Sequence, residues 1–272
     1  MGYPVLRELL VTRPVHEGAE WVERLRSAGW PARLLPLIEI APPADPGVRA
    51  ALAQMRAHAS SFDALMFVSG AAVTAFFDGL PVTAWSAGTR FWAPGPATAR
   101  RLAQALAAHG LDAGRVDAPP GDAGQFDSEA LWPVVRAQIR PGTRILLVRG
   151  GAATDTAIGS GREWLMRQCR DAGADVSVCM AYERRMPEWT PERVQSARSG
   201  CSPDALWLFS SSESLDNLAR VPMSLPWSQA SALATHPRIA DRVRAMGFGR
   251  VGQTRPTLPD VLAALESSWS HP

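Results

Sequence analysis

Short apolar runs alternate with segments of helical periodicity along almost the whole chain. A short apolar run bounded by turn residues is typical of a buried strand, whereas apolar residues at every third or fourth position indicate a helix. We expect strands at residues 9–12, 33–40, 64–68, 90–93, 116–118, 145–148, 175–184, 206–209, 231–234 and 250–253. We expect helices at residues 17–28, 46–59, 96–109, 129–138, 163–172, 191–198, 213–218, 237–246 and 258–267. This alternation predicts an α/β fold built on parallel, doubly wound sheets.

One strand–helix unit occurs twice, which indicates two domains of similar fold. The segment FDALMFVSG ends at Gly70, and the related segment PDALWLFSSS ends at Ser212. A second pair of related segments begins at Pro96 and at Pro237, where each opens a predicted helix. The start of a helix has free N–H groups and a partial positive charge. Helix starts on two similar halves therefore predict a cleft lined by anion-binding groups.

Composition excludes several classes of protein. The chain has 272 residues, with 28 Lys and Arg against 26 Asp and Glu, a balance that argues against a nucleic-acid binder. It has no apolar stretch of about 18 residues and no signal-like start, so we expect a cytoplasmic protein without a membrane segment. Its three cysteines form no C-x-x-C pair, and we expect them to be reduced and buried.

Motifs for common cofactors are missing from the sequence. There is no G-x-G-x-x-G, Walker A or H-E-x-x-H pattern, and no local Ser-His-Asp set. The segment 150–161 is expected to be a loop rich in Gly, Ala and Thr. If the chain is an enzyme, we expect it to work without a metal, a nucleotide cofactor or a covalent intermediate.

Two arginines follow predicted buried strands. Arg13 and Arg149 each come directly after such a strand, and doubly wound sheets bind their ligands at this edge. A guanidinium group there can bind a carboxylate or a phosphate through two parallel hydrogen bonds. The alternative interpretation is that each arginine ties its loop to a nearby acid.

Three hydroxyl residues stand near the helix starts. Ser69 and Ser211 end the repeated strands and are expected to cap the helices that follow. Capping is compatible with binding of an anion at the same helix start. Thr98 is expected to open its helix in the same way, while its counterpart in the repeat is Ile239, which cannot donate a hydrogen bond. The two halves are therefore not functionally equivalent. On the helix that contains Thr98, Arg101 is expected to face water.

Tyr182 is one of only two tyrosines, and it lies where a long predicted strand turns polar. A phenol is protonated at neutral pH, so it can donate a proton to a leaving hydroxyl group. The alternative interpretation is a half-buried strand tyrosine that only packs.

Short motifs along nearly the whole chain resemble those of the uroporphyrinogen-III synthase family. They are VTRP at 11–14, FVS at 67–69, GPATA at 95–99, QFDSEAL at 125–131, LLVRG at 146–150, AYER at 181–184, FSSS at 209–212 and THPRIA at 235–240. The resemblance implies two flavodoxin-like domains joined by a two-stranded connector. One domain would comprise residues 1–36 and 186–272 and the other residues 37–185, with connector strands near 35–41 and 180–186.

The resemblance also implies an activity. The family cyclises hydroxymethylbilane, a linear tetrapyrrole, with loss of water and inversion of ring D, in the biosynthesis of haem and sirohaem. It implies a cofactor-free lyase in which Tyr182 assists departure of the hydroxyl group. Ser69, Thr98, Ser211, Arg13 and Arg149 would bind the substrate, and we expect a monomer. The alternative that remains open is a non-catalytic two-domain module that binds a small anionic ligand.

Overall fold

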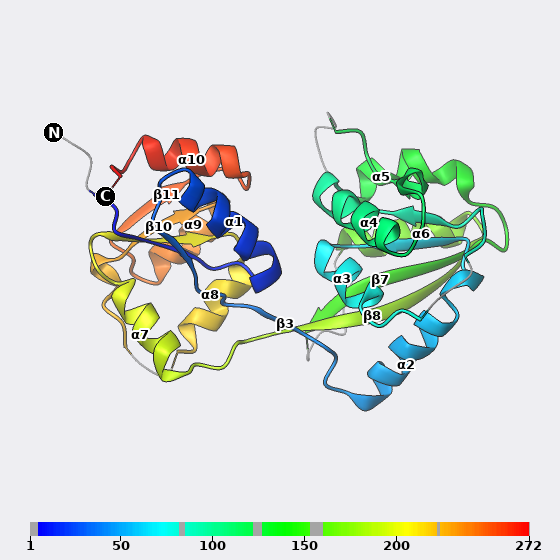
Figure 1. Ribbon diagram of the computed structural model, residues 1–272, viewed down its shortest axis with the longest axis horizontal. Helices are drawn as coiled ribbons and strands as arrows, with labels where there is room; N and C mark the ends of the chain where they lie inside the picture. Colours follow the sequence, from blue (N-terminus) through cyan, green and yellow to red (C-terminus); the bar gives the residue numbers. More distant parts are fainter. Residues whose placement is uncertain (1–4, 82–84, 122–126, 153–159, 222–223, 272) are drawn as a thin grey trace. The chain divides into compact units, whose positions relative to one another are not determined.

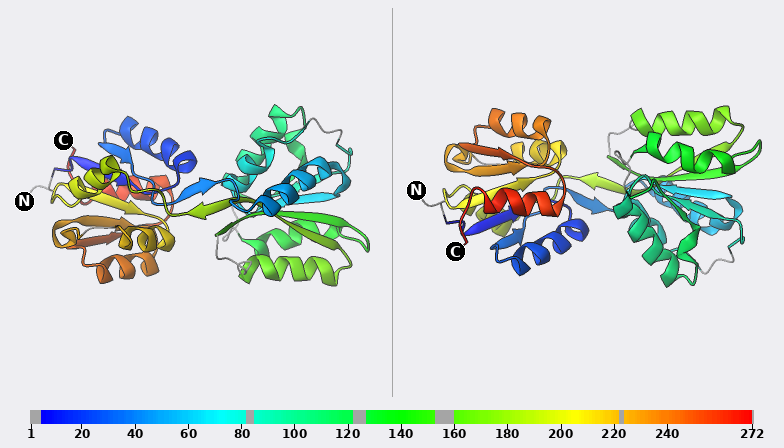
Figure 2. Two further views of the ribbon diagram at one scale, coloured as in Figure 1. Left: turned by 90° about the horizontal axis from the view of Figure 1, so that it is seen from below. Right: turned by 90° about the horizontal axis from the view of Figure 1, so that it is seen from above.

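The computed structural model describes residues 5–81, 85–121, 127–152, 160–221 and 224–271. The chain divides into two compact units (Figure 1). Unit 1 comprises Met1–Glu39 and Arg185–Pro272, and unit 2 comprises Ile40–Arg184. Each unit contains one sheet with helices on both of its faces, as Figure 2 shows. The predicted α/β class is confirmed.

The sheet of unit 1 has the strand order β11-β10-β9-β1-β2, and its strand pairs are parallel. Numbered along the unit, this is the order 2-1-3-4-5 of flavodoxin-like sheets. The strands are β1 (Glu8–Val11), β2 (Ala32–Leu34), β9 (Ala205–Phe209), β10 (Ser231–Ala234) and β11 (Arg250–Gln253). The helices are α1 (Val15–Ser27), α7 (Pro191–Ser199), α8 (Ser212–Ala219), α9 (Pro237–Ala245) and α10 (Leu258–Glu266), with a short 3-10 helix η4 (Trp227–Gln229).

Alternation along the strands divides the core of unit 1 into two layers. Leu206 and Leu208 of β9 pack with α1 and α10 on one face of the sheet. Trp207 and Phe209 of the same strand pack with α7, α8 and α9 on the other face. Because successive strand side chains point to opposite faces, a fully apolar strand such as β9 is buried on both sides.

The sheet of unit 2 has the order β3-β8-β7-β4-β5-β6. Its strands are β3 (Glu39–Ala41), β4 (Ala64–Phe67), β5 (Arg90–Trp92), β6 (Val116–Asp117), β7 (Arg144–Ala152) and β8 (Asp175–Arg185). Its helices are α2 (Pro46–Ala57), α3 (Gly70–Phe77), α4 (Pro96–Ala108), α5 (Ser128–Val135) and α6 (Ser160–Asp171), with 3-10 helices η1 (Ala59–Ser61), η2 (Ala113–Arg115) and η3 (Arg136–Gln138).

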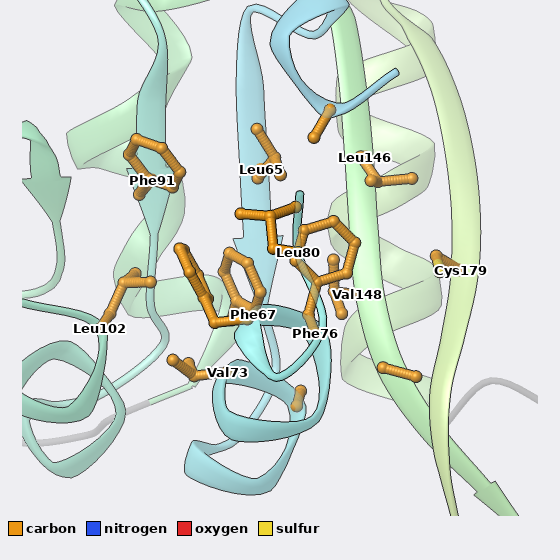
Figure 3. Packing of buried hydrophobic residues seen from close by; sticks show 14 of the residues in the cluster. Leu65, Phe67, Val73, Phe76, Leu80, Phe91, Leu102, Leu146, Val148 and Cys179 are labelled. Carbon is orange, nitrogen blue, oxygen red and sulfur yellow. The ribbon is translucent and has the colours of Figure 1, made fainter. Parts of the chain in front are cut away.

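The two faces of the unit 2 sheet are likewise covered by separate sets of helices. Residues of α2, α3 and α4 pack on one face around Phe67, which has an edge-to-face contact with Phe76 at 5.6 Å between ring centroids (Figure 3). Residues of α5 and α6 pack on the other face around Met66 and Leu147. Helix α3 therefore packs on this face of the sheet, and its N-terminus follows the carboxyl end of β4.

Apart from the additional edge strand β3 of unit 2, the two sheets have the same arrangement of strands, but the order of these strands along the chain is permuted. In unit 1, β10 and then β11 lie on one side of the repeated strand β9. In unit 2, β5 and then β6 lie on the corresponding side of the repeated strand β4. On their other side lie the pairs β1–β2 and β7–β8. Unit 1 begins with this pair, whereas unit 2 ends with it. Pair β7–β8 of unit 2 is thus the counterpart of β1–β2.

The strand expected at residues 33–40 is two strands. β2 ends at Leu34, and β3 begins at Glu39 in the sheet of unit 2. Pro36 lies between them and has no N–H group to donate to a ladder. The amides of Leu35 and Leu37 still bond to Val11 and Thr12 of the β1 segment. The connecting segment is consequently extended, but only its last part is a strand.

The three cysteines are free and buried, as expected. Burial raises the pKa of Cys169, Cys179 and Cys201 to about 11 in each case. The thiols are consequently protonated at neutral pH, which makes them poor nucleophiles. No helix of the described residues is long and apolar enough to cross a membrane.

Candidate active site

Ser69 caps the helix that follows the central strand of unit 2. Its Oγ accepts a hydrogen bond from the amide of Ala72 at 3.1 Å, at the start of α3. The preceding strand β4 is buried along its whole length, and it delivers Ser69 to the carboxyl edge of the sheet. Doubly wound sheets bind ligands at this edge. The expected capping role of Ser69 is confirmed.

Tyr182 is brought to the same place from β8. Its hydroxyl oxygen lies 3.2 Å from Oγ of Ser69, and either oxygen can be the donor of this hydrogen bond. The Tyr182 side chain is only 4% exposed, so it is buried more deeply than the half-buried packing that one interpretation assumed. Burial fixes the ring, while the hydrogen bond holds its hydroxyl group beside the N-terminus of α3.

Strand β7 continues beyond Arg149, contrary to the loop expected from Gly150 onward. It runs to Ala152, and Gly150 pairs with Tyr182 of β8. The prediction was wrong here because glycine favours loops in general, whereas these glycines allow a close approach by side chains of the neighbouring strand. Residues 153–159 of the expected loop lie outside the described residues.

Arg149 lies within β7, at the carboxyl half of the strand. Its Nη1 reaches the carbonyl oxygen of Gly150 only at 3.5 Å. Its Nε is buried and has no hydrogen-bond partner among the residues that the structure describes. A buried N–H donor without a partner costs free energy, so this guanidinium is suited to an acceptor supplied by a ligand.

Thr98 does not cap its helix as expected. The N-cap of α4 is Gly95, which has no side chain, and Thr98 is buried within the first helical turn. The proline after Gly95 fixes the first helical residue, so the helix begins earlier than a capping threonine would require. Thr98 therefore lies inside the first turn of α4 rather than at its cap.

Arg101 was expected only to face water, and it is exposed on α4. A Cβ atom added at Gly70 would lie 3.9 Å from both Cβ and Cγ of Arg101. The stem of Arg101 thus passes beside the first residue of α3. The sequence has no signal for this contact, because it depends on the packing of α3 against α4.

In unit 1, Ser211 does not make the expected capping hydrogen bond, while Arg13 has an acid beside it, as one interpretation assumed. Ser211 is the N-cap residue of α8, but its side chain makes no capping hydrogen bond. Arg13 lies 4.1 Å from the centre of the Trp21 ring, and its Nη1 bonds to Glu17 at 3.4 Å. Burial lowers the pKa of Arg13, and Glu17 partly offsets this effect. The interpretation of Arg13 as a partner of a nearby acid is thus confirmed, and its Nε has no partner among the described atoms.

Arg13 and Arg149 are not equivalent positions of the two sheets. Val11 pairs with Leu208, and Val148 pairs with Phe67. Leu208 and Phe67 match in the sequence repeat, so Arg149 takes the place of Thr12 rather than that of Arg13. Arg149 is thus a strand residue of β7, whereas Arg13 lies two residues beyond the end of β1.

The decisive comparison is with models of protein families. The model described as uroporphyrinogen-III synthase HemD matches residues 19–263, which is most of the chain. The chain belongs to the uroporphyrinogen-III synthase family. It is therefore related to cyclising lyases that act on a tetrapyrrole.

Solved structures of similar fold carry the same family name. Uroporphyrinogen-III synthetase from Helicobacter pylori is 16% identical, with a TM-score of 0.56, and the match covers 96% of this chain and 99% of that one. A mutant uroporphyrinogen III synthase from Thermus thermophilus is 19% identical, with a TM-score of 0.49 and coverage of 96% and 98%.

In this member of the uroporphyrinogen-III synthase family, the candidate site of unit 2 contains the hydroxyl groups of Ser69 and Tyr182 beside the backbone amides at the start of α3. Within the described residues no group of three or more His, Cys, Asp and Glu side chains is arranged to hold a metal ion. Hydroxyl groups and helix-start amides can orient carboxylates, and a phenol can donate a proton.

The two N-cap serines are expected to differ in their contribution to stability. We expect Ser69→Ala to lower the free energy of unfolding by about 1 kcal/mol, the usual contribution of an N-cap hydrogen bond. Ser211→Ala is expected to have a smaller effect, because Ser211 makes no such bond. Urea unfolding of the two variants measures the difference, and an equal loss for both would contradict the assignment.

Proposed function

We propose that this chain converts hydroxymethylbilane into uroporphyrinogen III, closing the linear tetrapyrrole with inversion of ring D and loss of water. The observation that carries the proposal is the family match over residues 19–263. The pairing of Tyr182 with Ser69 at the carboxyl edge of unit 2 supports it, because it supplies a proton donor in a fixed place.

In the proposed first step the terminal hydroxyl group leaves the substrate. The pyrrole nitrogen pushes its electron pair toward the terminal carbon, and the carbon–oxygen bond breaks with its pair going to oxygen. Tyr182 donates the proton that converts this oxygen to water. The pyrrole N–H then releases a proton that restores the phenol, leaving an electrophilic methylene group on the first ring.

Ring closure with inversion follows from control of the substrate's conformation. The last ring attacks the methylene carbon through its substituted carbon, which gives a spiro intermediate. The bond from that carbon to the original methylene bridge then breaks, and the bridge forms a new bond to the free α-carbon of the same ring. This carbon loses its proton, and the ring is left inverted. The linear molecule also cyclises unaided, without inversion. Holding the reacting carbons in one arrangement is therefore the main task of the protein.

The protein can control the conformation of the substrate by binding the acetate and propionate side chains, or arms, of hydroxymethylbilane. We assign carboxylate binding to Arg149, whose Nε lacks a partner among the described residues, and to the helix start capped by Ser69. Thr98 of unit 2, and Arg13 and Ser211 of unit 1, complete the proposed substrate-binding set.

Several further properties belong to the same proposal. We assign units 1 and 2 as the folding domains, the cytoplasm as the compartment, and a monomer without cofactor as the active form. The free, buried cysteines support a reducing compartment. Among the residues that the structure describes, only four large apolar side chains are exposed, those of Val5, Val15, Val178 and Met186, and this small number supports a monomer. Light scattering of the purified protein measures the mass in solution, and a stable dimer would contradict the last point.

The proposed reaction is tested by incubating purified protein with hydroxymethylbilane and separating the product isomers after oxidation to porphyrins. We expect the isomer with inverted ring D. Formation of only the unrearranged isomer, at the rate found without protein, would reject the proposed function.

Arg149→Gln is expected to raise KM by about tenfold or more, because a hydrogen bond to a charged group contributes about 1.5–3 kcal/mol. Its effect on kcat should be small, since Arg149 holds an arm of the substrate rather than the leaving hydroxyl group. The matched control is Arg140→Gln, which removes an exposed arginine near the start of β7. Equal KM values for Arg149→Gln and Arg140→Gln would contradict the assignment.

A further inference from the structure

A β-bulge lies next to Tyr182. The pairing of β7 with β8 is regular from Arg144 to Arg149, which is opposite Met180, but the next residue, Gly150, is opposite Tyr182. Ala181 is therefore the extra residue of β8. Bulges of this kind re-aim a side chain, and they often occur next to active sites.

The bulge changes the face of the sheet on which Tyr182 lies. Regular alternation would place Cys179 and Ala181 on one face and Tyr182 on the other. In the structure all three belong to the same core cluster, which also contains α3. The extra residue thus turns the ring of Tyr182 toward the helix that Ser69 caps.

The ring of Tyr182 occupies the space that a side chain at residue 150 would fill. A Cβ atom added to Gly150 would lie 2.2 Å from Cζ, 2.4 Å from Cε2 and 2.7 Å from Cε1 of Tyr182. These distances are far below van der Waals contact, and the atoms belong to a rigid ring that is 4% exposed. Any larger residue at this position would displace the phenol from its present location.

We propose that Gly150 is a positioning residue for Tyr182: its bare backbone and the adjacent bulge seat the ring so that the phenol hydroxyl meets Ser69. The proposal rests on the proposed function of Tyr182 as proton donor. Gly150 itself does not touch the substrate in this account. Gly150 affects the reaction only by fixing the position of the Tyr182 hydroxyl oxygen.

The first test compares Gly150→Ala with Gly151→Ala. A Cβ atom at Gly151 would meet chiefly Sδ of Met180, at 2.3 Å, and that thioether can rotate away. We expect Gly150→Ala to lower kcat about a hundredfold, the cost of a displacement near 1 Å, with little change in KM. Gly151→Ala is expected to retain the parent kcat. Equal effects of the two variants would overturn the proposal.

A double-mutant comparison separates positioning from a general disturbance. If Gly150 acts through the phenol, Gly150→Ala should lower kcat no further once Tyr182→Phe has removed the hydroxyl group. The same fold-loss in both backgrounds would contradict the proposal. If Gly150→Ala does not fold, Ser69→Ala and Ser69→Thr provide the second pair of variants. We expect Ser69→Ala to lose kcat and Ser69→Thr to recover it. No recovery of kcat in Ser69→Thr would overturn the proposal.

A spectroscopic readout is independent of turnover. The chain has only two tyrosines, so Tyr3→Phe leaves Tyr182 as the sole tyrosine. With isotope-labelled tyrosine, we expect Gly150→Ala to shift the ring resonances of Tyr182 and Gly151→Ala to leave them in place. Unshifted resonances in Gly150→Ala would overturn the positioning role. Shifted resonances in a protein without synthase activity would instead reject the proposed function and retain the seating of the ring.

Discussion

Tyr182→Phe is expected to lower kcat by about a hundredfold or more, within the range that general acid catalysis contributes. The substitution removes the hydroxyl group that lies 3.2 Å from Ser69 and keeps the ring that packs in the core of unit 2. The departing hydroxide then has no positioned proton donor. We expect KM to change little, because the phenol acts on the leaving group and the arms of the substrate are bound elsewhere.

The matched control is Tyr3→Phe, which makes the same chemical change at the only other tyrosine. It should retain the parent kcat. Steady-state rates with hydroxymethylbilane, together with urea unfolding to show that the variant is folded, decide the matter. Equal kcat values for the parent and Tyr182→Phe would remove Tyr182 from the mechanism.

Trp207→Ala is expected to destabilise unit 1 by about 3–5 kcal/mol, the usual cost of truncating a large buried aromatic side chain. Trp207 has no exposed surface and stacks on Phe209 at 5.7 Å between ring centroids. Its Nε1 also donates a hydrogen bond of 2.7 Å to the carbonyl oxygen of Gly200, at the end of α7. Truncation would leave a cavity and an unpaired buried carbonyl group.

Trp207→Phe is the graded control, because it keeps a ring and removes the indole N–H. We expect a loss between those of the parent and Trp207→Ala. Thermal or urea unfolding measures both variants, and a loss below about 1 kcal/mol for Trp207→Ala, a value typical of surface sites, would contradict the described core.

Most elements could be predicted from the sequence, because each depends on local pattern. The apolar runs at 64–67 and 205–209 are buried strands, and the serines after them begin helices, as the repeat indicated. The family was also predicted from short motifs, and the family model confirms it. Helices that begin with proline, such as α9 at Pro237, could also be predicted from the sequence.

The arrangement around Tyr182 could not be predicted, because it depends on contacts between strands. Gly150 and Gly151 have the composition of a loop, yet they extend β7 because side chains of β8 need their space. The bulge at Ala181 reverses the alternation that the sequence indicates for Tyr182. A single sequence does not indicate which residue of a neighbouring strand lies opposite a given residue.

The permuted order of the strands in the two units could not be predicted, for the same reason. The sequence repeat covers β4 and β9 with their helices, but the pairs β7–β8 and β1–β2 lie at opposite ends of their units along the chain. Their equivalence follows only from the neighbours of each strand. Arg149 and Arg13 therefore looked alike in the sequence, whereas strand register places Arg149 at the position of Thr12.

The most direct test of the central claim is the isomer composition of the product formed from hydroxymethylbilane by the parent protein and by Tyr182→Phe, measured beside a sample without protein. The account predicts that the parent gives uroporphyrinogen III almost exclusively, and that Tyr182→Phe forms it far more slowly. Parent protein that yields only the unrearranged isomer found in the protein-free sample would contradict the account.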